Sequence, residues 1–174
     1  MARVMDDLWV FAYGSLIWRP GFEYEERARA RLAGFHRSLC IYSHVHRGTP
    51  ERPGLVFGLD RGGSCVGMAF RVRADRAEAT VAYLRERELV TNVYLETRLP
   101  VRLLDGRPVR ALAYVVDRGH AQYAGRLSVD MAAALVARSH GQSGANRDYV
   151  LSALEEIQRL GLNDRWLESV AARL

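Results

Sequence analysis

The chain has 174 residues, a net charge of +5, and ordinary shares of hydrophobic (49%) and charged (26%) residues. A chain of this length is typical of one globular domain that buries roughly 70% of its unfolded surface, so it needs no metal or disulfide to fold. All 25 basic residues are arginines, which excludes a Schiff-base lysine, a pyridoxal-phosphate lysine and a P-loop lysine. We predict a single domain over residues 1–174.

The cysteines and the first residues bear on the cellular compartment. Cys40 and Cys65 are the only cysteines, too few for a Cys-rich zinc site or a disulfide framework. We expect two buried thiols, with a single bridge as the alternative. Asp6 and Asp7 precede the first apolar run and break the pattern of a signal peptide. The longest apolar run, residues 131–137, is too short to cross a membrane. These features predict a cytoplasmic protein with no membrane partner.

The first half of the chain has the pattern of strands and turns. Residues 8–13 are apolar and β-prone, and Gly14 ends this buried strand in a turn. The pair Gly62–Gly63 predicts another turn between two short strands. Strands are predicted over residues 8–13, 32–43, 55–59 and 65–72.

The second half begins with a helix from Asp75, as its N-cap, to about Glu88. Asp105–Gly106 predicts a hairpin turn between strands at 93–104 and 109–116. Helices follow over residues 128–140, 146–160 and 163–173, with Ser128 and Asn163 as caps and Gly161 as a stop. The outline is α+β: a small mixed, mostly antiparallel β-barrel of about six strands with flanking helices and a helical C-terminal segment at about 128–174.

One carboxylate stands out on the helix that starts at Asp75. Ala77, Val81, Leu84 and Glu88 are spaced to lie on one helical face, so Glu88 continues an apolar stripe. Two residues back, Glu86 lies about 160° away around the helix. A carboxylate on the core-facing side is desolvated, which raises its pKa and suits it to acid/base chemistry near neutral pH. The alternative is a half-exposed glutamate at a helix end.

Two loops are candidates for ligand binding. The turn at residues 13–16 follows a buried strand, and such a turn can direct backbone N–H groups toward a carboxylate or phosphate. Arg47 lies in a Gly- and Pro-containing loop, and an arginine can bind a carboxylate with two parallel hydrogen bonds. A strand-ending turn and a solvated surface arginine are the plainer interpretations of the same residues.

Several longer segments point in one direction when they are taken together. They are YGSLIW within residues 11–18, HRGTPE at 46–51, the pairs Tyr83–Leu84 and Arg87–Glu88, Tyr94, residues 123–125, and SGANRDY at 143–149. These segments, in this order and over nearly the whole chain, resemble the ChaC-type glutathione-specific γ-glutamylcyclotransferases.

The resemblance implies a small β-barrel with flanking helices and a cofactor-free breakdown of glutathione to 5-oxoproline and cysteinylglycine. By the same resemblance, the loop of Tyr13, Gly14, Ser15 and Leu16 holds the γ-glutamyl group, and Glu88 is the catalytic acid/base. Arg47 and Tyr123 are similar to further pocket residues, and no metal is implied. Asn92 departs from the pattern, because many family members have glycine there.

Other functions remain open on the sequence alone. The same chemistry could act on other γ-glutamyl amino acids or amines. The charge of +5 and the strand aromatics could suit a nucleic-acid-binding barrel, but acidic residues are interspersed with the arginines and no basic stripe is visible, so we expect no nucleic-acid partner. His44 and His46 would share one face of a strand and could be half of a metal site, although no third ligand is indicated.

Overall fold

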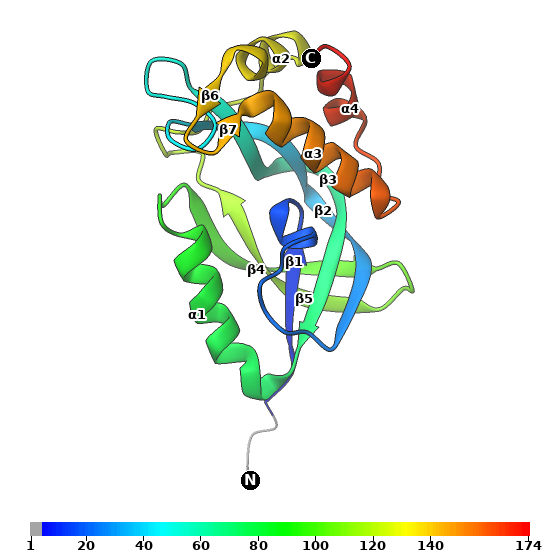
Figure 1. Cartoon of the computed structure of the whole chain (residues 1–174). Coiled ribbons are helices and arrows are strands. Elements are labelled where there is room, and N and C mark those ends of the chain that lie inside the picture. The colour runs from blue at the N-terminus through cyan, green and yellow to red at the C-terminus, as the bar shows by residue number, and fades with distance from the viewer. Residues whose placement is uncertain (1–4) are drawn as a thin grey trace. The chain divides into compact units, whose positions relative to one another are not determined.

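A computed structural model describes residues 5–174 and divides into two compact units (Figure 1). The first unit comprises residues 5–36 and 61–115, and the second comprises residues 37–60 and 116–174. Two long strands, β2 (Glu26–Ser43) and β3 (Gly54–Val72), contribute residues to both units. Each unit contains buried apolar side chains, among them Val10 and Phe70 in the first unit and Leu39 and Ile157 in the second.

Five strands close into a barrel in the order β1-β3-β2-β4-β5, so the fold is α+β as predicted. Strand β1 (Leu8–Ala12) runs antiparallel to β3 and parallel to β5 (Pro108–Val116), with Val10 opposite both Phe70 and Leu112. Strand β4 (Tyr94–Leu103) is antiparallel to β2. Four of the five residues of β1 are buried, so both of its faces are covered, which agrees with its nearly continuous apolar sequence.

Strand β3 corrects the prediction of two short strands with a reversal between them. Gly62 and Gly63 both have positive φ (102° and 64°), yet the chain continues as one strand. The carbonyl of Gly62 lies 2.9 Å from Nδ1 of His36 on β2, so the irregularity is held against the neighbouring strand. Positive-φ glycines serve a bulge as well as a hairpin turn, and here they shape a bulge-like bend. The barrel therefore has five strands rather than about six.

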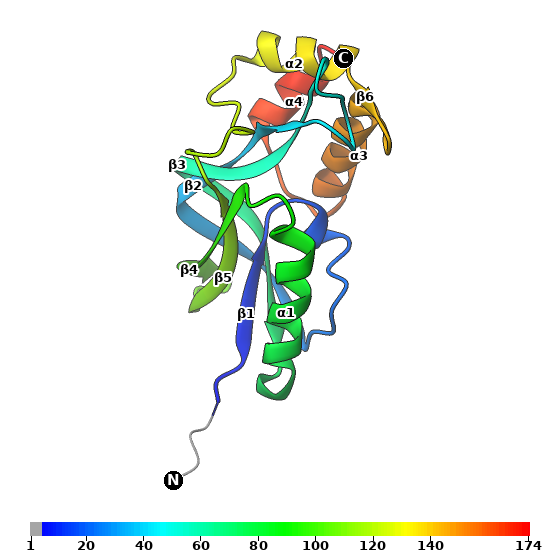
Figure 2. The same cartoon turned by 90° about the vertical axis from the view of Figure 1, so that its left-hand side faces the viewer.

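The other elements of the first unit agree with the sequence patterns except at one cap. A short 3-10 turn, η2 (Ala74–Arg76), precedes helix α1 (Ala77–Glu88). The predicted N-cap was wrong: the cap position is Arg76, and the Asp75 carboxylate instead accepts a hydrogen bond from Arg73 at 2.8 Å. Strands β4 and β5 form the predicted hairpin, which Figure 2 shows from the side. Its turn contains Gly106, with φ at 97°.

Three helices belong to the second unit: α2 (Val129–Arg138), α3 (Asn146–Arg159) and α4 (Arg165–Ala171). They pack on one another (Figure 1), and buried Val136, Ile157 and Leu167 are among their contributions to the core. A two-residue hairpin that the sequence did not predict, β6 (His140–Gly141) and β7 (Gly144–Ala145), connects α2 to α3.

The helix ends of this unit test the predicted caps. The Ser128 side chain accepts a hydrogen bond from the backbone N–H of Met131, as expected for an N-cap. Gly161, with φ at 73°, donates to the carbonyl of Gln158 and ends α3 as expected. The cap predicted at Asn163 was wrong by one residue, because Asp164 accepts from the N–H of Leu167.

Asn146 connects helix α3 to strand β3 inside the second unit. Its side chain is completely buried; Oδ1 accepts from the N–H of Leu55 and Nδ2 donates to the Leu55 carbonyl, both at 2.8 Å. One amide side chain thus satisfies both backbone groups of a buried strand residue. An unsatisfied buried backbone group is costly, so this contact fixes the start of α3 on the strand.

We therefore expect Asn146→Ala to lower the free energy of unfolding by about 2–5 kcal/mol, because two buried backbone groups lose their partners. Ser143→Ala is the matched control in the same segment. It removes an exposed hydrogen bond to His46 and should cost less than about 1 kcal/mol. Urea unfolding of both variants measures the difference. Equal losses would contradict the role assigned to Asn146.

Candidate active site

Glu88 is the last residue of α1, and its environment agrees with the predicted helix phase. Its side chain is only 16% exposed, and Leu84, one turn earlier, is fully buried. Glu86 lies on the exposed side of the same helix. Glu88 therefore lies on the inward side of α1, where its carboxylate is largely shielded from water, whereas the carboxylate of Glu86 is exposed to solvent.

Burial raises the pKa of Glu88 above the ordinary glutamate value, because desolvation disfavours the charged form. The guanidinium of Arg87 acts in the opposite direction on this pKa, with its Nε 3.6 Å from Oε1 of Glu88. Burial, followed by the hydrogen bond that its hydroxyl donates to Glu96 on β4 at 2.8 Å, raises the pKa of Tyr114 on β5, and the charge of Glu88 adds to this effect. Glu88 is thus a partly desolvated carboxylate that holds a proton more tightly than an ordinary glutamate does.

The turn at residues 13–16 begins where strand β1 ends. A single 3-10 turn, η1 (Ser15–Ile17), follows Gly14, and the N–H of Ile17 donates to the Gly14 carbonyl at 2.9 Å. The side chains of Tyr13 and Leu16 are buried at 9% and 6% exposure, whereas that of Ser15 is exposed. The turn is therefore anchored by its apolar side chains, and it offers the Ser15 hydroxyl and backbone groups for hydrogen bonding.

The side chain of Arg87 connects this turn to helix α1. Its Nη2 donates to Oγ of Ser15 at 3.0 Å, and its Nη1 donates to the carbonyl of Arg19 at 2.6 Å. The same Nη1 lies 3.1 Å from the hydroxyl of Tyr83, one turn earlier on the helix. Arg87, the neighbour of Glu88 in sequence, thereby connects the last turn of α1 to the turn at Ser15 within the first unit.

Arg47 belongs to the second unit, in a tightly packed loop. Its Nη1 donates to the Ala145 carbonyl at 3.3 Å, and its guanidinium lies 5.3 Å from the ring centroid of Tyr149. A Cβ atom on Gly54 would come within 2.3 Å of the Arg47 carbonyl oxygen, so only glycine fits there. The glycine in this sequence segment therefore serves the packing of the loop that holds Arg47.

Tyr123 also belongs to the second unit, where it depends on an acid that the sequence reading missed. Its hydroxyl donates to Oδ2 of Asp60 at 2.7 Å, and Nε of Arg118 donates to Oδ1 at 2.7 Å. Burial, followed by the interaction with Asp60, raises the pKa of Tyr123 to about 12, so the phenol stays protonated. Asp60 is 1% exposed at the end of the buried stretch of β3. An aspartate among buried strand positions was the available clue.

The remaining candidates have other partners. Nδ1 of His46 pairs with Oγ of Ser143 at 2.9 Å, and the ring of His44 stacks on Tyr42. Within residues 5–174, no three side chains of His, Cys, Asp or Glu gather closely enough to hold a metal ion. Cys40 and Cys65 are buried thiols rather than halves of a disulfide, as expected.

Asn92 lies in the loop between α1 and β4 and has a left-handed backbone, with φ at 56°. It is the one non-glycine residue with positive φ among the described residues. Asparagine tolerates this conformation better than most residues, and glycine adopts it freely. The backbone thus explains why a glycine or an asparagine suits this position.

Comparison with known proteins assigns the chain to a family. The family model described as ChaC-like protein matches residues 8–173. A glutathione-specific γ-glutamylcyclotransferase of Escherichia coli K12 is 34% identical over 94% of this chain and 71% of its own length. One from Danio rerio, named glutathione-specific γ-glutamylcyclotransferase 1, is also 34% identical, over 96% of this chain and 88% of its own.

The fold has a close counterpart among solved structures. A γ-glutamylcyclotransferase specific to glutathione from yeast matches with a TM-score of 0.83 at 22% identity, over 97% of this chain and 95% of the yeast chain. In the described part of the chain, every helix is too short or too polar to cross a membrane. The barrel with its helices, together with a family match over almost the whole sequence, shows that this chain belongs to the ChaC-like family.

Proposed function

We infer that this protein is a glutathione-specific γ-glutamylcyclotransferase that converts glutathione to 5-oxoproline and cysteinylglycine. The observation that carries this inference is the desolvated carboxylate of Glu88, connected through Arg87 to the turn at Ser15. Relatives from bacteria and vertebrates at 32–34% identity bear the same activity in their names.

The reaction needs little beyond positioning and proton transfer. The α-amine of the γ-glutamyl unit attacks its own γ-carbonyl carbon, closes a five-membered ring and releases the amine of cysteinylglycine. Because nucleophile and carbonyl belong to one molecule, the enzyme mainly has to hold the folded-over conformer. The attacking amine loses a proton, and the departing amine gains one.

We propose that Glu88 carries this proton. Its carboxylate accepts the proton from the attacking α-amine and then donates it to the departing nitrogen, a role that contributes about 10²–10⁴-fold to the rate. A raised pKa makes the carboxylate a stronger base than a glutamate in water, which helps it to take the proton, and it keeps that proton on Glu88 for the departing nitrogen in the second step. One carboxylate thus serves both halves of the reaction.

The turn at Tyr13, Gly14, Ser15 and Leu16 is the proposed binding element for the γ-glutamyl group. Buried Tyr13 and Leu16 fix the backbone of the turn, while Ser15 is accessible. N–H groups at such a turn can bind the α-carboxylate or the oxyanion that develops at the γ-carbon. For Arg47 and Tyr123, a role in substrate binding remains a prediction from the family resemblance.

We also propose a cytoplasmic location. Both cysteines are buried thiols rather than a disulfide, which is usual where glutathione keeps proteins reduced. The proposed substrate is the same reductant, so enzyme and substrate would share a compartment.

The purified protein should convert reduced glutathione to equimolar 5-oxoproline and cysteinylglycine without added metal or nucleotide. Glu88→Gln should keep the fold and lower kcat by about 10²–10⁴-fold, because it removes the proton carrier. Glu86→Gln, on the exposed face of the same helix, is the control and should be nearly silent. Wild-type turnover in Glu88→Gln would remove Glu88 from the mechanism. Activity only toward other γ-glutamyl amines would redefine the substrate.

The pH dependence of kcat/KM should reveal the raised pKa of Glu88. Glu88 must be ionised to accept a proton, so kcat/KM should fall as the pH drops through an apparent pKa above about 4.3, the ordinary glutamate value. The nearby charge that acts on this limb is the guanidinium of Arg87, which lowers the pKa of Glu88 against the effect of burial. A pH–rate profile in which the acidic limb lies at or below the ordinary value would contradict desolvation of Glu88.

Desolvation of Glu88 should also be visible in stability, independently of activity. The folded pKa of Glu88 lies above its unfolded value, so its favourable contribution is present at low pH and is lost as the pH rises through the folded pKa. Glu88→Gln stays neutral, so its stability relative to the wild type should increase from acidic to neutral pH. Urea unfolding at both pH values measures this, with Glu86→Gln as the exposed control. An unchanged difference would show that Glu88 is hydrated.

A further inference from the structure

The chain that follows the turn at Ser15 runs past helix α1, and the two segments are held together by a few separate contacts. Arg87, in the last turn of the helix, donates to Ser15 and to the Arg19 carbonyl. Arg76, at the start of the helix, forms an ion pair with Glu23. The same segment of chain is therefore tied to both ends of α1 within the first unit.

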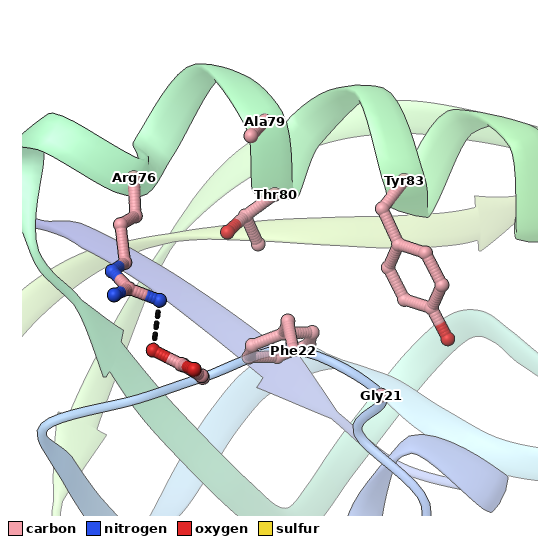
Figure 3. Close-up of a pocket in the computed structure, with 7 residues that line it drawn as sticks. Gly21, Phe22, Arg76, Ala79, Thr80 and Tyr83 are labelled. Atoms are coloured by element: carbon pink, nitrogen blue, oxygen red, sulfur yellow. Dashed lines mark hydrogen bonds and ion pairs between the residues drawn. The ribbon is translucent and has the colours of Figure 1, made fainter.

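Between these two ties lies an open pocket of about 240 Å³, lined by residues of α1 and of the segment. Figure 3 shows Arg76, Thr80 and Tyr83 projecting from the helix toward the chain that carries Gly21 and Phe22. Its lining residues are Gly21, Phe22, Glu23, Arg76, Ala79, Thr80 and Tyr83. The segment itself packs on the barrel, where the rings of Phe22 and Phe70 meet edge to face with 5.7 Å between their centroids. Because space remains between the segment and α1 in the middle, these two are held to each other mainly by the polar contacts at the ends.

At the Arg87 end, the backbone of the segment comes so close to α1 that a side chain would not fit between them. Gly21 has φ at 74°, and a Cβ atom there would lie 2.0 Å from the hydroxyl oxygen of Tyr83. The Tyr83 hydroxyl, in turn, lies 3.1 Å from Nη1 of Arg87. The backbone of the segment thus approaches the helix closely at the turn that bears Arg87 and Glu88.

The guanidinium of Arg87 donates its hydrogen bonds to Ser15 and the segment that follows it rather than to the neighbouring carboxylate of Glu88. Its Nε stands 3.6 Å from Oε1 of Glu88, which is too long for a hydrogen bond, whereas its contacts to Ser15 and Arg19 measure 3.0 and 2.6 Å. The carboxylate of Glu88 is thereby left to interact with a substrate. The side chain of Arg87 is 24% exposed, so these bonds are partly shielded from water.

We propose that Arg87 is a positioning residue for this reaction: it holds the Ser15 turn at a fixed place relative to Glu88 on the same helix. The proposal rests on the proposed function, in which the turn binds the γ-glutamyl group and Glu88 moves the proton. Arginine suits the task because its planar fork of five N–H donors can bind several acceptors at once. A lysine has one donor group and can satisfy only part of this set.

Arg87→Met and Arg87→Lys test the proposal, with Arg76→Met as the matched control. Arg76→Met breaks a tie between the same two segments, but at the helix end remote in sequence from Ser15 and Glu88. Steady-state kinetics with glutathione should show kcat for Arg87→Met lowered by about 100-fold, the loss that a misplacement of about 1 Å causes. Arg87→Lys should recover part of the loss, and Arg76→Met should keep the wild-type kcat and KM.

A purely structural role would lower thermal stability without this kinetic pattern. Circular dichroism should therefore confirm that every variant is folded at the assay temperature. Wild-type kcat in folded Arg87→Met would overturn the proposal, and so would an equal loss of kcat in Arg76→Met.

Hydrogen–deuterium exchange of the peptide that contains residues 14–19 separates this proposal from the proposed function. The amides of Ile17 and Arg19 are hydrogen-bonded within the turn, so they report on its order. They should exchange faster in Arg87→Met than in the wild type or in Arg76→Met. If Arg87→Met shows this faster exchange but the wild type fails to convert glutathione, the proposed function falls and the anchoring by Arg87 stands. Unchanged exchange in Arg87→Met would refute the anchoring itself.

Discussion

The partial withdrawal of the Glu88 carboxylate from water is the constraint on which the proposed chemistry depends. A glutamate at a helix end normally reaches solvent. Keeping its carboxylate desolvated costs free energy, which the packing of the surrounding side chains has to offset. Here the stripe of α1 that contains buried Leu84 is turned inward, and Glu88 follows one turn later. Arg87 limits the cost by providing a nearby positive charge without forming a short ion pair with the carboxylate.

The second unit relies on a different device, which is the satisfaction of buried backbone and side-chain groups by polar side chains. Asn146 pairs with both backbone groups of Leu55, and the Tyr149 hydroxyl accepts from the N–H of Phe57 two residues further along β3. Asp60, at the same end of that strand, accepts from Tyr123 and Arg118. The segment at 143–149 has the sequence pattern of a helix cap. In the structure, its Asn146 and Tyr149 attach α3 to strand β3. Its asparagine faces a strand because a buried N–H and C=O need partners.

Most strand and helix positions could be predicted from periodicity and turn residues, because these features act locally. The buried strand at β1, the phase of α1 and the cap at Ser128 depend on residues within one or two turns of one another. The errors occurred where a local pattern has two solutions. Gly62–Gly63 permits a hairpin or a bulge, and the neighbouring strand with His36 selects the bulge. Asp75, which can cap a helix, is drawn to Arg73, and Asp164 rather than Asn163 caps α4.

The sequence by itself determined the α+β class and the family, and it predicted Glu88 as the catalytic acid/base, because helical spacing and motif order are properties of the chain alone. It also indicated the turn at residues 13–16 as a candidate binding element. Only the tertiary structure revealed that Arg87 joins that turn to α1, that Asp60 holds Tyr123, and that Asn146 completes a buried strand. Each of these contacts joins residues more than 60 positions apart. Side-chain hydrogen bonds over such separations leave no periodic trace in a sequence, since they depend on how the elements pack.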